Sequence, residues 1–460
     1  MIGGSESWPV RIGAVGDIGI SPGTVVWRVR GAAEIRVSVI VKATLAIVPE
    51  GDMVLREPDP LVLHDAHHHA DSQCSLRIAS DLAPYLGQAE VLVTGHAYAP
   101  PERPTPMAGA RLVVHREGQI LVTKTISVQG DRRLEYGQLS EPAPFQRMPL
   151  IYERAAYHPD LNPVGVHPSR GVPNLVHSAD PSLPGCFGPL ARRWPARQRL
   201  LGGLDPRQTC GVRVDFPEGF AWEHLQASPP DQRLDFLHGT EGILLGGMHP
   251  TLPMVRSRMP GIRAMACVYP DRDGAGERLR LWADTLIIDT DRQVCSIVWR
   301  GNFGVDDEAR LRPMRIRAGI ELPGAPLTFP GEAGSGGRAA MASIYEVAMP
   351  MEAPTPASAP PLAAAEPAEE DIDEMPTDEF ETLNEHELEP VLEEDDEDAV
   401  ATRGVGFRFP LPSNAAEPPW FPAGPQPQPP GAAPGPGLQA PRSGDEDEVV
   451  TPRGGRGPGG

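Results

Sequence analysis

Lysine is almost missing from this chain, and other common features are missing with it. Of its 41 basic residues, only Lys42 and Lys124 are lysines. This strong arginine bias, together with 49 glycines and 55 prolines, indicates a GC-rich genome, and we expect a bacterial source. No window approaches about 18 apolar residues, so we expect no membrane-spanning helix. The first twenty residues have neither a basic region nor a continuous apolar region, which argues against a signal peptide.

Paired cysteines are also missing. The five cysteines are scattered, odd in number and without C-x-x-C spacing. The sequence therefore predicts neither a disulfide framework nor a zinc site, and it favours the reducing cytoplasm. The net charge of −21 lies at one end of the chain. Residues 1–330 hold 35 Lys+Arg and 36 Asp+Glu, whereas residues 331–460 hold 6 and 26, so the acidic balance describes the last third.

Strand signals dominate the first 325 residues. The runs rich in β-branched side chains are residues 25–31, 35–48, 90–99, 110–128, 150–157, 262–270, 280–303 and 314–322. Glu117-Gly118-Gln119 and Asp289-Thr290-Asp291-Arg292 break two of these runs into predicted hairpins. Only residues 80–87 and 222–237 have a locally helical pattern. We expect a mainly β fold, a β-sandwich or barrel-like set of sheets with short helices and long irregular loops.

The composition also divides the chain. Residues 1–325 form the predicted β-rich domain, with halves 1–157 and 158–325 if it divides at all. Residues 158–220 are crowded with Pro, Gly and Asn, and we interpret them as an ordered irregular arm across the sheets, anchored by Phe187 and Trp194. Residues 326–460 are linker-like, and their segment 366–398 carries 18 Asp/Glu and no Lys or Arg. Such a composition predicts a disordered tail.

Catalytic and metal-binding motifs are weak. HDAHHH at 64–69 offers four histidines, but strand breakers surround them and no carboxylate or thiol cluster stands at a fixed spacing. DTDRQ at 289–293 begins like a calcium loop but lacks its central Gly and its final Glu. GAVGDIGIS at 13–21 lacks the G-K-[ST] of a phosphate-binding loop. We predict no metal site, no cofactor and no catalytic residue.

The stretch SPPDQR raises the choice between catalysis and architecture. Pro229-Pro230 restricts the backbone, so that Asp231 is held rigidly at the start of a segment that continues with Gln232 and Arg233. Asp231 could cap the following segment, and Arg233 could form a bidentate pair with a carboxylate. Catalysis needs a second acid, base or metal, which the neighbouring sequence does not supply. We interpret the stretch as a structural clamp, and Lys42 and Lys124 as paired positions that bond carbonyls or carboxylates at a sheet edge.

ARRWPARQR at 191–199 gathers arginines around an aromatic side chain. Its candidate partner-binding residues are Arg192, Arg193, Trp194, Arg197 and Arg199. A surface ion-pair face, a site for an acidic segment such as the chain's own tail, and weak nucleic-acid binding are the alternatives. Within the tail, short apolar islands could fold on a partner or only interrupt a solubilising extension. Their candidate residues are Phe380, Leu383, Phe407, Phe409 and Trp420.

Several phrases follow one another in order from about residue 20 to residue 320. They include SVIVKATLAIVPEG, SDLAPYLGQAEVLVTGHAYAP, PFQRMPLIYERAAY, FGPLARRWPAR, FAWEHLQASPPDQRLDFLHGTEGILL and DTLIIDTDRQVCSIVWRG. Together these phrases resemble the bacterial family of domain of unknown function 2169. Arg154 and Trp222 lie in these phrases and join the clamp or recognition candidates. The resemblance implies a cytoplasmic adaptor of type VI secretion, which binds a toxic effector and helps to load it onto the spike. It implies no catalytic residues.

These observations lead to an expected function and two alternatives. We expect a non-enzymatic adaptor or chaperone whose partners are a secreted effector and a spike component, with no membrane partner. One alternative is a carboxylate-dependent, carbohydrate-active hydrolase that uses residues such as Asp231, Glu241 or Asp289. It requires two of these carboxylates on opposite sides of a cleft. The other alternative is a nucleic-acid-binding protein that acts through residues 191–199.

Overall fold

The computed structural model describes residues 8–135, 138–272 and 274–332. Strands predominate within these residues, and the one α-helix among them, α1 (Pro195–Gln198), has four residues. The prediction of a mainly β fold is therefore confirmed. No helix in these ranges is long and apolar enough to span a membrane. The predicted tail beyond residue 332 lies outside the described residues, and the domain boundary at 325 stays a prediction.

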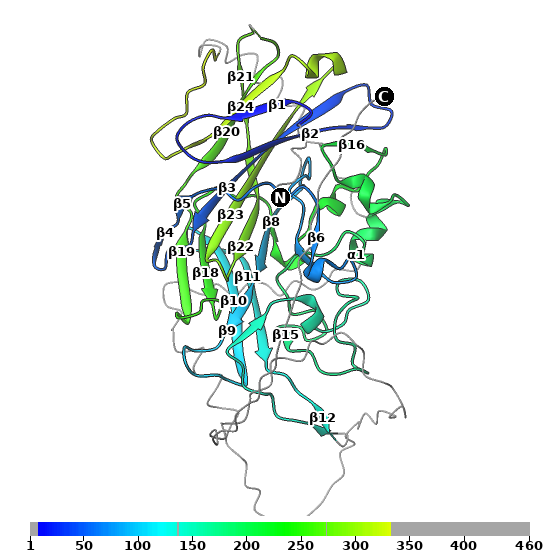
Figure 1. The fold of residues 1–460 in the computed structure, drawn as a ribbon, viewed down its shortest axis with the longest axis vertical. Coiled ribbons are helices and arrows are strands. Elements are labelled where there is room, and N and C mark those ends of the chain that lie inside the picture. The colour runs from blue at the N-terminus through cyan, green and yellow to red at the C-terminus, as the bar shows by residue number, and fades with distance from the viewer. Residues whose placement is uncertain (1–7, 136–137, 273, 333–460) are drawn as a thin grey trace, which may run out of the picture. The chain divides into compact units, whose positions relative to one another are not determined.

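The larger of the two main sheets (Figure 1) has the strand order β16-β2-β3-β23-β22-β8-β17, with β5 paired to β3. Its eight strands are β2 (Ser21–Val29), β3 (Ile35–Ala46), β5 (Val54–Arg56), β8 (Ala89–Thr94), β16 (Arg213–Phe216), β17 (Arg233–Leu234), β22 (Trp282–Asp289) and β23 (Val294–Val305). β8 runs parallel to β22, and β16 runs parallel to β2. The predicted hairpin at Asp289–Arg292 is confirmed, because β22 and β23 pair in antiparallel fashion.

Strand β3 shows why this sheet lies in the middle of the fold. Its sequence, IRVSVIVKATLA, is rich in β-branched side chains, which fit a pleated surface. Val39 and Val41 join the main hydrophobic core on one face, whereas Ile40 joins a second core with Trp27 and Phe216 on the other. A strand that is covered on both faces is apolar at nearly every position and does not alternate strictly.

The second main sheet has six strands in the order β15-β11-β10-β18-β19-β4. They are β4 (Gly51–Asp52), β10 (Met107–Arg116), β11 (Gln119–Gln129), β15 (Leu175–His177), β18 (Gly242–Gly246) and β19 (Met254–Arg258). The predicted hairpin between β10 and β11 is confirmed. Its turn residues Glu117 and Gly118 have φ of 51° and 84°, which matches the two-residue turns that suit the twist of paired strands.

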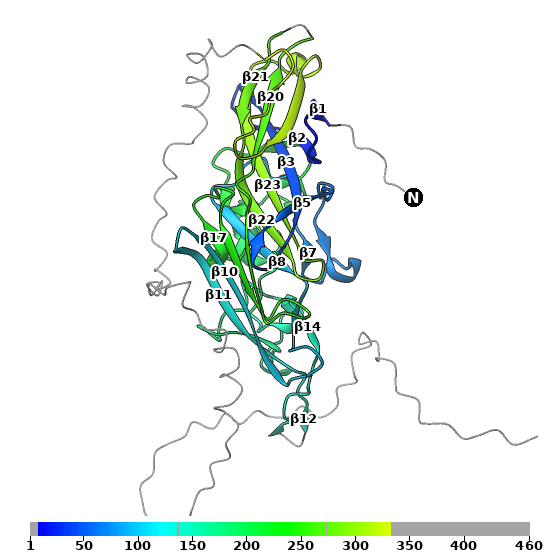
Figure 2. The ribbon, with the colours of Figure 1, turned by 90° about the vertical axis from the view of Figure 1, so that its left-hand side faces the viewer.

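The two main sheets share one hydrophobic core. Alternate residues of β10 and β11, such as Leu112 and Ile126, pack in the same cluster as Val41 of β3 and Ile297 of β23. Figure 2 shows β10 and β11 in a layer next to β22 and β23, which is the arrangement of a sandwich. Strands from both sides of residue 157 contribute to each main sheet.

A third sheet of four strands stands at the top of Figure 1, in the order β1-β24-β20-β21. Its strands are β1 (Arg11–Ala14), β20 (Arg263–Tyr269), β21 (Glu277–Arg280) and β24 (Arg315–Glu321). Ala264, Ala266, Ile316 and Ile320 turn one face of this sheet toward the main core. The chain passes from β21 to β22 through the buried Leu281 and so joins this sheet to the eight-stranded one.

The remaining elements are short. Three two-stranded sheets pair β6 (Ala66–His67) with β7 (Leu76–Ile78), β9 (His96–Tyr98) with β14 (Arg147–Pro149), and β12 (Leu134–Glu135) with β13 (Gln138–Leu139). Seven 3-10 turns occur in the described ranges: η1 (His68–Ala70), η2 (Tyr152–Arg154), η3 (Arg199–Leu201), η4 (Pro206–Thr209), η5 (Trp222–Leu225), η6 (Pro230–Gln232) and η7 (Glu308–Leu311). In the arm at 158–220, β15 pairs with β11 and β16 with β2, while Phe187 and Trp194 are buried as expected.

Four expectations about local structure were wrong or incomplete. Residues 150–157 form the turn η2 and isolated bridges instead of a strand. Residues 80–87 are not helical but irregular with bends, because Pro84 disfavours the helical conformation of the residue before it, and Leu82 is buried within this segment. Residues 222–237 contain only the turns η5 and η6 and the start of β17. Strands β18 and β19 were missed, because GILLG is a short apolar run without a distinct period and MVRSR has only two apolar residues.

Candidate functional site

The stretch SPPDQR lies where the two main sheets meet the arm. Asp231 accepts hydrogen bonds from Lys124 of β11, with oxygen-to-nitrogen distances of 2.9 and 3.1 Å. Gln232 accepts from the same ammonium group at 3.1 Å. Lys124 is 4% exposed and points from the six-stranded sheet into the interior. Two neighbouring polar side chains therefore hold one buried cation that lies 107 residues away in sequence.

Gln232 connects the Lys124–Asp231 pair to two more segments of the chain. Its amide nitrogen donates to the carbonyl of Val91 in β8 at 2.7 Å and to the carbonyl of Phe187 in the arm at 2.9 Å. The Gln232 side chain is fully buried, so these bonds satisfy polar atoms that would otherwise be costly. The Lys124 ammonium also lies 5.6 Å from the centre of the Phe187 ring. One glutamine thus connects both sheets and the arm.

Asp231 is held in its charged form. Burial by itself raises its pKa, but the hydrogen bond from His177 and the nearby Lys124 ammonium lower the pKa of Asp231 to about 2. The His177 Nε2 atom lies 3.5 Å from the Asp231 carboxylate. A carboxylate with so low a pKa is a poor proton acceptor at neutral pH. The cluster therefore has the properties of a structural ion pair and not those of a catalytic acid–base pair.

Two details of the predicted clamp were wrong. Asp231 does not cap the following segment, since the turn η6 has Pro229 at its cap position and no side-chain cap bond. Its carboxylate is engaged by Lys124 and His177 instead. Arg233 donates to the carbonyl of Ser228 at 3.0 Å and forms no bidentate pair with a carboxylate in the described part of the chain. Burial lowers the pKa of Arg233.

Lys42 forms a second buried ion pair. Its ammonium lies 2.9 Å from a carboxylate oxygen of Asp81, and the two side chains are 4% and 2% exposed. Asp81 also accepts the backbone N–H of Val62 at 2.7 Å. The two lysines do pair with carboxylates, but neither lies at a sheet edge. Lys42 is in β3, between β2 and β23, and Lys124 is in β11, between β15 and β10.

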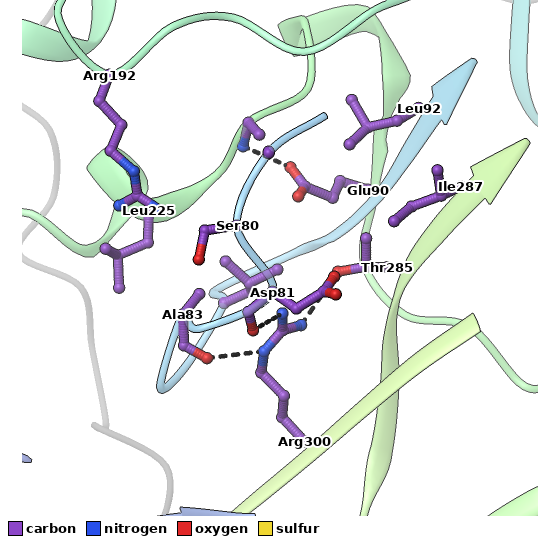
Figure 3. A pocket seen from close by; sticks show the side chains of 13 residues that line it. Ser80, Asp81, Ala83, Glu90, Leu92, Arg192, Leu225, Thr285, Ile287 and Arg300 are labelled. Atoms are coloured by element: carbon purple, nitrogen blue, oxygen red, sulfur yellow. Dashed lines mark hydrogen bonds between the residues drawn. The ribbon is translucent and has the colours of Figure 1, made fainter. Parts of the chain in front are cut away.

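A third polar cluster surrounds Arg300 of β23 (Figure 3). The Arg300 guanidinium donates to the carbonyls of Ala83 at 2.7 Å and Asp81 at 2.8 Å, and to the carboxylate of Asp284. Burial raises the pKa of Asp284 to about 6, and the adjacent Arg300 opposes this rise. The cavity among these groups has a volume of about 10 Å³, the space of a single water molecule. It is too small for a substrate.

Glu90 completes this part of the interior. Its carboxylate accepts the backbone N–H groups of Ala227 at 2.7 Å and Ser228 at 2.9 Å, directly before the Pro229-Pro230 pair. Glu90 is 4% exposed and belongs to β8. The segment that carries Asp231 is therefore tied to β8 by Glu90 and to β11 by Lys124.

The arginine cluster at 191–199 is largely internal, contrary to its interpretation as a surface patch. Arg197 is 2% exposed and donates to the carbonyls of Leu190 and His224. Burial lowers its pKa to about 9. Trp194 is buried against the ring of Tyr152, with ring centres 5.0 Å apart. The apolar core must be shielded from water, and Trp194 and Arg197 of the arm are part of that shielding layer.

The other members of this cluster differ in exposure. Arg192 is 7% exposed and pairs with Asp65 at 3.0 Å, so it belongs to the interior as well. Arg199 is exposed and lies 3.2 Å from Asp160. Arg193 is half-buried. Only Arg193 and Arg199 of the five candidates have substantial solvent access for a partner.

The other residues selected from the sequence, Arg154 and Trp222, contact neighbouring side chains. Arg154 donates to Asp131 at 2.8 Å and to Asn174 at 3.0 Å. Trp222 is half-buried in an aromatic cluster, and its ring centre lies 5.3 Å from that of Trp27. The tail candidates Phe380, Leu383, Phe407, Phe409 and Trp420 lie outside the described residues. No cluster of three or more metal-binding side chains occurs within the described ranges, the histidine run included.

The three carboxylates of the hydrolase alternative each have partners of their own. Asp231 pairs with Lys124, as described above. Glu241 is fully buried and accepts the backbone N–H groups of His238, Gly239 and Thr240. Asp289 accepts two backbone N–H groups in the turn between β22 and β23. These contacts are those of carboxylates that stabilise turns and ion pairs.

Sequence reasoning missed an exposed aromatic surface, which we define as Phe236, His238, Trp282, Arg116 and Arg280. Phe236 is 47% exposed and Trp282 is 52% exposed. Phe236 stacks on His238 with ring centres 4.9 Å apart. Arg116 lies 5.2 Å from the centre of the Phe236 ring, and Arg280 lies 3.6 Å from that of Trp282.

The backbone brings the two halves of this aromatic surface together. Leu237 and Ala283 form an antiparallel bridge, and both side chains are buried. Because side chains alternate along a strand, the neighbours Phe236, His238 and Trp282 point away from the core. Neither RLDFLHG nor RLWAD carries a local signal that its aromatic side chain is exposed. The pairing of two segments 46 residues apart was not visible in the sequence.

The family comparison agrees with the resemblance in sequence. Residues 32–300 match the family described as "Uncharacterized protein conserved in bacteria (DUF2169)". The chain belongs to this family. No curated protein and no solved structure matches the chain at a significant level. The matched range includes Lys42, Lys124, Asp231 and the aromatic surface.

Proposed function

We propose that this protein is a non-enzymatic cytoplasmic adaptor that binds a type VI secretion effector and helps to load it onto the spike. The observation that carries the proposal is the aromatic surface. Exposed Trp and Phe rings beside arginines are typical of protein–protein contacts, where a few such side chains supply most of the binding free energy. The family resemblance suggests what the partner is.

The polar interior supports the same proposal. Asp231, a candidate carboxylate of the hydrolase alternative, pairs with Lys124, while Asp81 pairs with Lys42 and Glu90 accepts backbone N–H groups. Burial raises the pKa of Cys186 to about 12, so its thiol is not a nucleophile at neutral pH. A rigid scaffold that presents a fixed surface is what an adaptor needs, because preorganisation lowers the entropic cost of binding.

The first experiment is affinity purification of the tagged protein from its own cytoplasm, with and without residues 331–460. We expect a toxin-like effector or a spike protein in stoichiometric amount. Recovery by the truncated form would assign binding to the described body, and loss on truncation would assign it to the tail. A protein recovered without any such partner would contradict the adaptor function.

The second experiment tests the surface itself. We expect the Trp282→Ala variant to lose at least tenfold in affinity for the recovered partner, since a truncated aromatic hot spot costs about 2 kcal/mol or more. Tyr157→Ala is the matched control, because Tyr157 is another exposed aromatic side chain, outside the aromatic surface. Equal affinities for both variants would exclude the aromatic surface as the contact.

A further inference from the structure

One face of the four-stranded sheet is built from arginine. The strand registers place the side chains of residues 11, 263, 278, 280, 315 and 317 on the same face, because directly paired residues share a face. All six of these residues are arginines. The other positions of this face are Gly13, Met265, Cys267, Tyr269, Gly319 and Glu321. We call these twelve positions the arginine face.

The opposite face of the same sheet is apolar. It carries residues such as Ala266, Leu279, Ile316 and Ala318, which pack in the main core. The arginines therefore follow a strict alternation with core residues, and the sheet can only turn them outward. Arg11, Arg263 and Arg317 are exposed.

Aromatic rings lie among these guanidinium groups. Arg315 is 5.8 Å from the centre of the Tyr269 ring, and Arg278 is 5.5 Å from that of Phe329. Arg280 connects the arginine face to the aromatic surface through Trp282. Guanidinium groups among rings favour a ligand that carries both carboxylates and apolar side chains.

The face carries an excess of positive charge. Among the described residues, the face holds six arginines and Glu321, and Glu332 of the covering segment pairs with this face, so the formal balance of these eight residues is 6 − 2 = +4. Both glutamates pair with Arg278. No ion pair of Arg11, Arg263 or Arg317 occurs among the residues that the structure describes. Unpaired surface arginines with one sign of charge attract an anionic partner.

The end of the described chain already lies on this face. Leu327 and Phe329 pack against Cys267 and Tyr269 in a small hydrophobic cluster. The backbone of Glu332 forms a parallel bridge with Gly276, directly before β21. At Glu332 the chain therefore runs in the same direction as β21, toward Arg280.

We propose that the acidic segment 366–398 of this same chain docks on the arginine face. The segment carries 18 Asp/Glu without any Lys or Arg, and its apolar side chains include Phe380 and Leu383. Only residues 333–365 separate it from Glu332, and a linker of this length reaches up to about 110 Å when extended. The four strands of the face span only about 15 Å. Covalent connection gives the segment an effective concentration in the millimolar range, which no free polyanion matches.

This docking has a consequence for the aromatic surface. Because Arg280 belongs to both surfaces, a docked acidic segment lies next to Trp282 and competes with a protein partner for it. The inference itself does not depend on the adaptor function, since it concerns only contacts within one chain. The proposed binding site for the tail is this exposed sheet face and not the largely internal arginines at 191–199.

The test uses the full chain and the triple variant Arg11→Gln, Arg263→Gln and Arg317→Gln. Its control is Arg28→Gln, Arg213→Gln and Arg258→Gln, which removes three exposed arginines from the two main sheets. Small-angle scattering gives the radius of gyration as salt rises from about 20 to about 500 mM. The Debye length falls from about 20 Å to below about 5 Å over this range, so a charge-driven contact is lost.

The sign of the salt response decides the outcome. We expect the wild-type chain and the control to expand with salt, because the acidic segment is released. We expect the triple variant to contract with salt, because an undocked segment of like charges repels itself less as screening increases. A wild-type chain that contracts in the same way as the triple variant would overturn the proposal.

A second measurement keeps the proposal testable if the triple variant fails to fold. A fluorescent peptide of residues 366–398 is titrated against the full chain and against a chain that lacks only those residues. We expect binding to the deleted chain to be at least tenfold tighter, because the face is then uncovered. Equal binding would overturn the proposal. Equal, salt-sensitive binding of a single-stranded RNA of about 30 nucleotides to both chains would also overturn it and assign the face to nucleic acid.

Discussion

The ion pair between Lys42 and Asp81 offers the sharpest test of the buried locks. Replacing Lys42 by Met keeps most of the side-chain volume but removes the ammonium group. The Asp81 carboxylate, 2% exposed, then retains the backbone N–H of Val62 as a donor. Breaking a buried pair by removing one partner costs about 3–5 kcal/mol. We expect the free energy of unfolding of Lys42→Met to fall by this amount at neutral pH.

The assay is urea unfolding of the purified variants, followed by tryptophan fluorescence and circular dichroism. The control is Arg28→Met, which breaks the exposed pair between Arg28 and Asp215, with side chains 51% and 50% exposed. Surface pairs contribute less than about 1 kcal/mol. The double variant Lys42→Met with Asp81→Asn buries no charge, so we expect it to be more stable than Lys42→Met alone.

A Lys42→Met variant within about 1 kcal/mol of the wild type at neutral pH would refute the argument that this pair is a buried lock.

Three other predictions concern Asp231, His224 and Gln232. The folded pKa of Asp231, about 2, lies below its unfolded value, so its contribution to stability is lost as pH falls from about 4 to 2. The melting temperature of Asp231→Asn should not show this part of the decrease. Burial lowers the pKa of His224 to about 4, so the unfolded chain binds a proton on this imidazole at a higher pH than the folded chain does. The stability should therefore fall as pH decreases from 6.5 to 4. A melting temperature that stays constant over this range would contradict the burial of a neutral imidazole. Gln232→Leu removes three hydrogen bonds, so we expect the free energy of unfolding in urea to fall by about 3 kcal/mol. The control Gln226→Leu removes the single bond to Gln88 and should lower it by about 1 kcal/mol. Equal losses would contradict the role of Gln232 as the connection between both sheets and the arm.

Local sequence was a good guide to the strands and a poor guide to the arm. The β-branched run at 35–48 and the turn residues Glu117 and Gly118 act within a few residues, so their structures were predictable. The run LIYERAAY has strand composition, but Tyr152 donates to the carbonyl of Gly188 and is buried, which holds it in the turn η2. Tertiary contacts of this kind override a local preference.

The candidate site was predictable only in part. Asp231, Gln232, Lys42 and Lys124 were selected from the sequence as structural residues, and the structure places all four in hydrogen-bonded clusters, in which Asp231 alone is exposed, at 37% of its side chain. Their partners were not predictable, because a register between distant strands decides which side chains meet. The arginines at 191–199 illustrate the opposite case. A charged run is usually exposed, but an arginine whose donors all reach backbone carbonyls can be buried, as Arg197 is.

The sequence by itself determined the fold class, both hairpins, the unequal distribution of charge and the family, because these depend on composition, on local order or on motifs read along the chain. The tertiary structure decided which charges are internal and which faces are exposed. The arginine face shows the physical reason. Its six arginines come from β1, β20, β21 and β24, which span more than 300 residues of sequence. Only the pairing of those strands, combined with the two-residue alternation of side chains, places them on one surface.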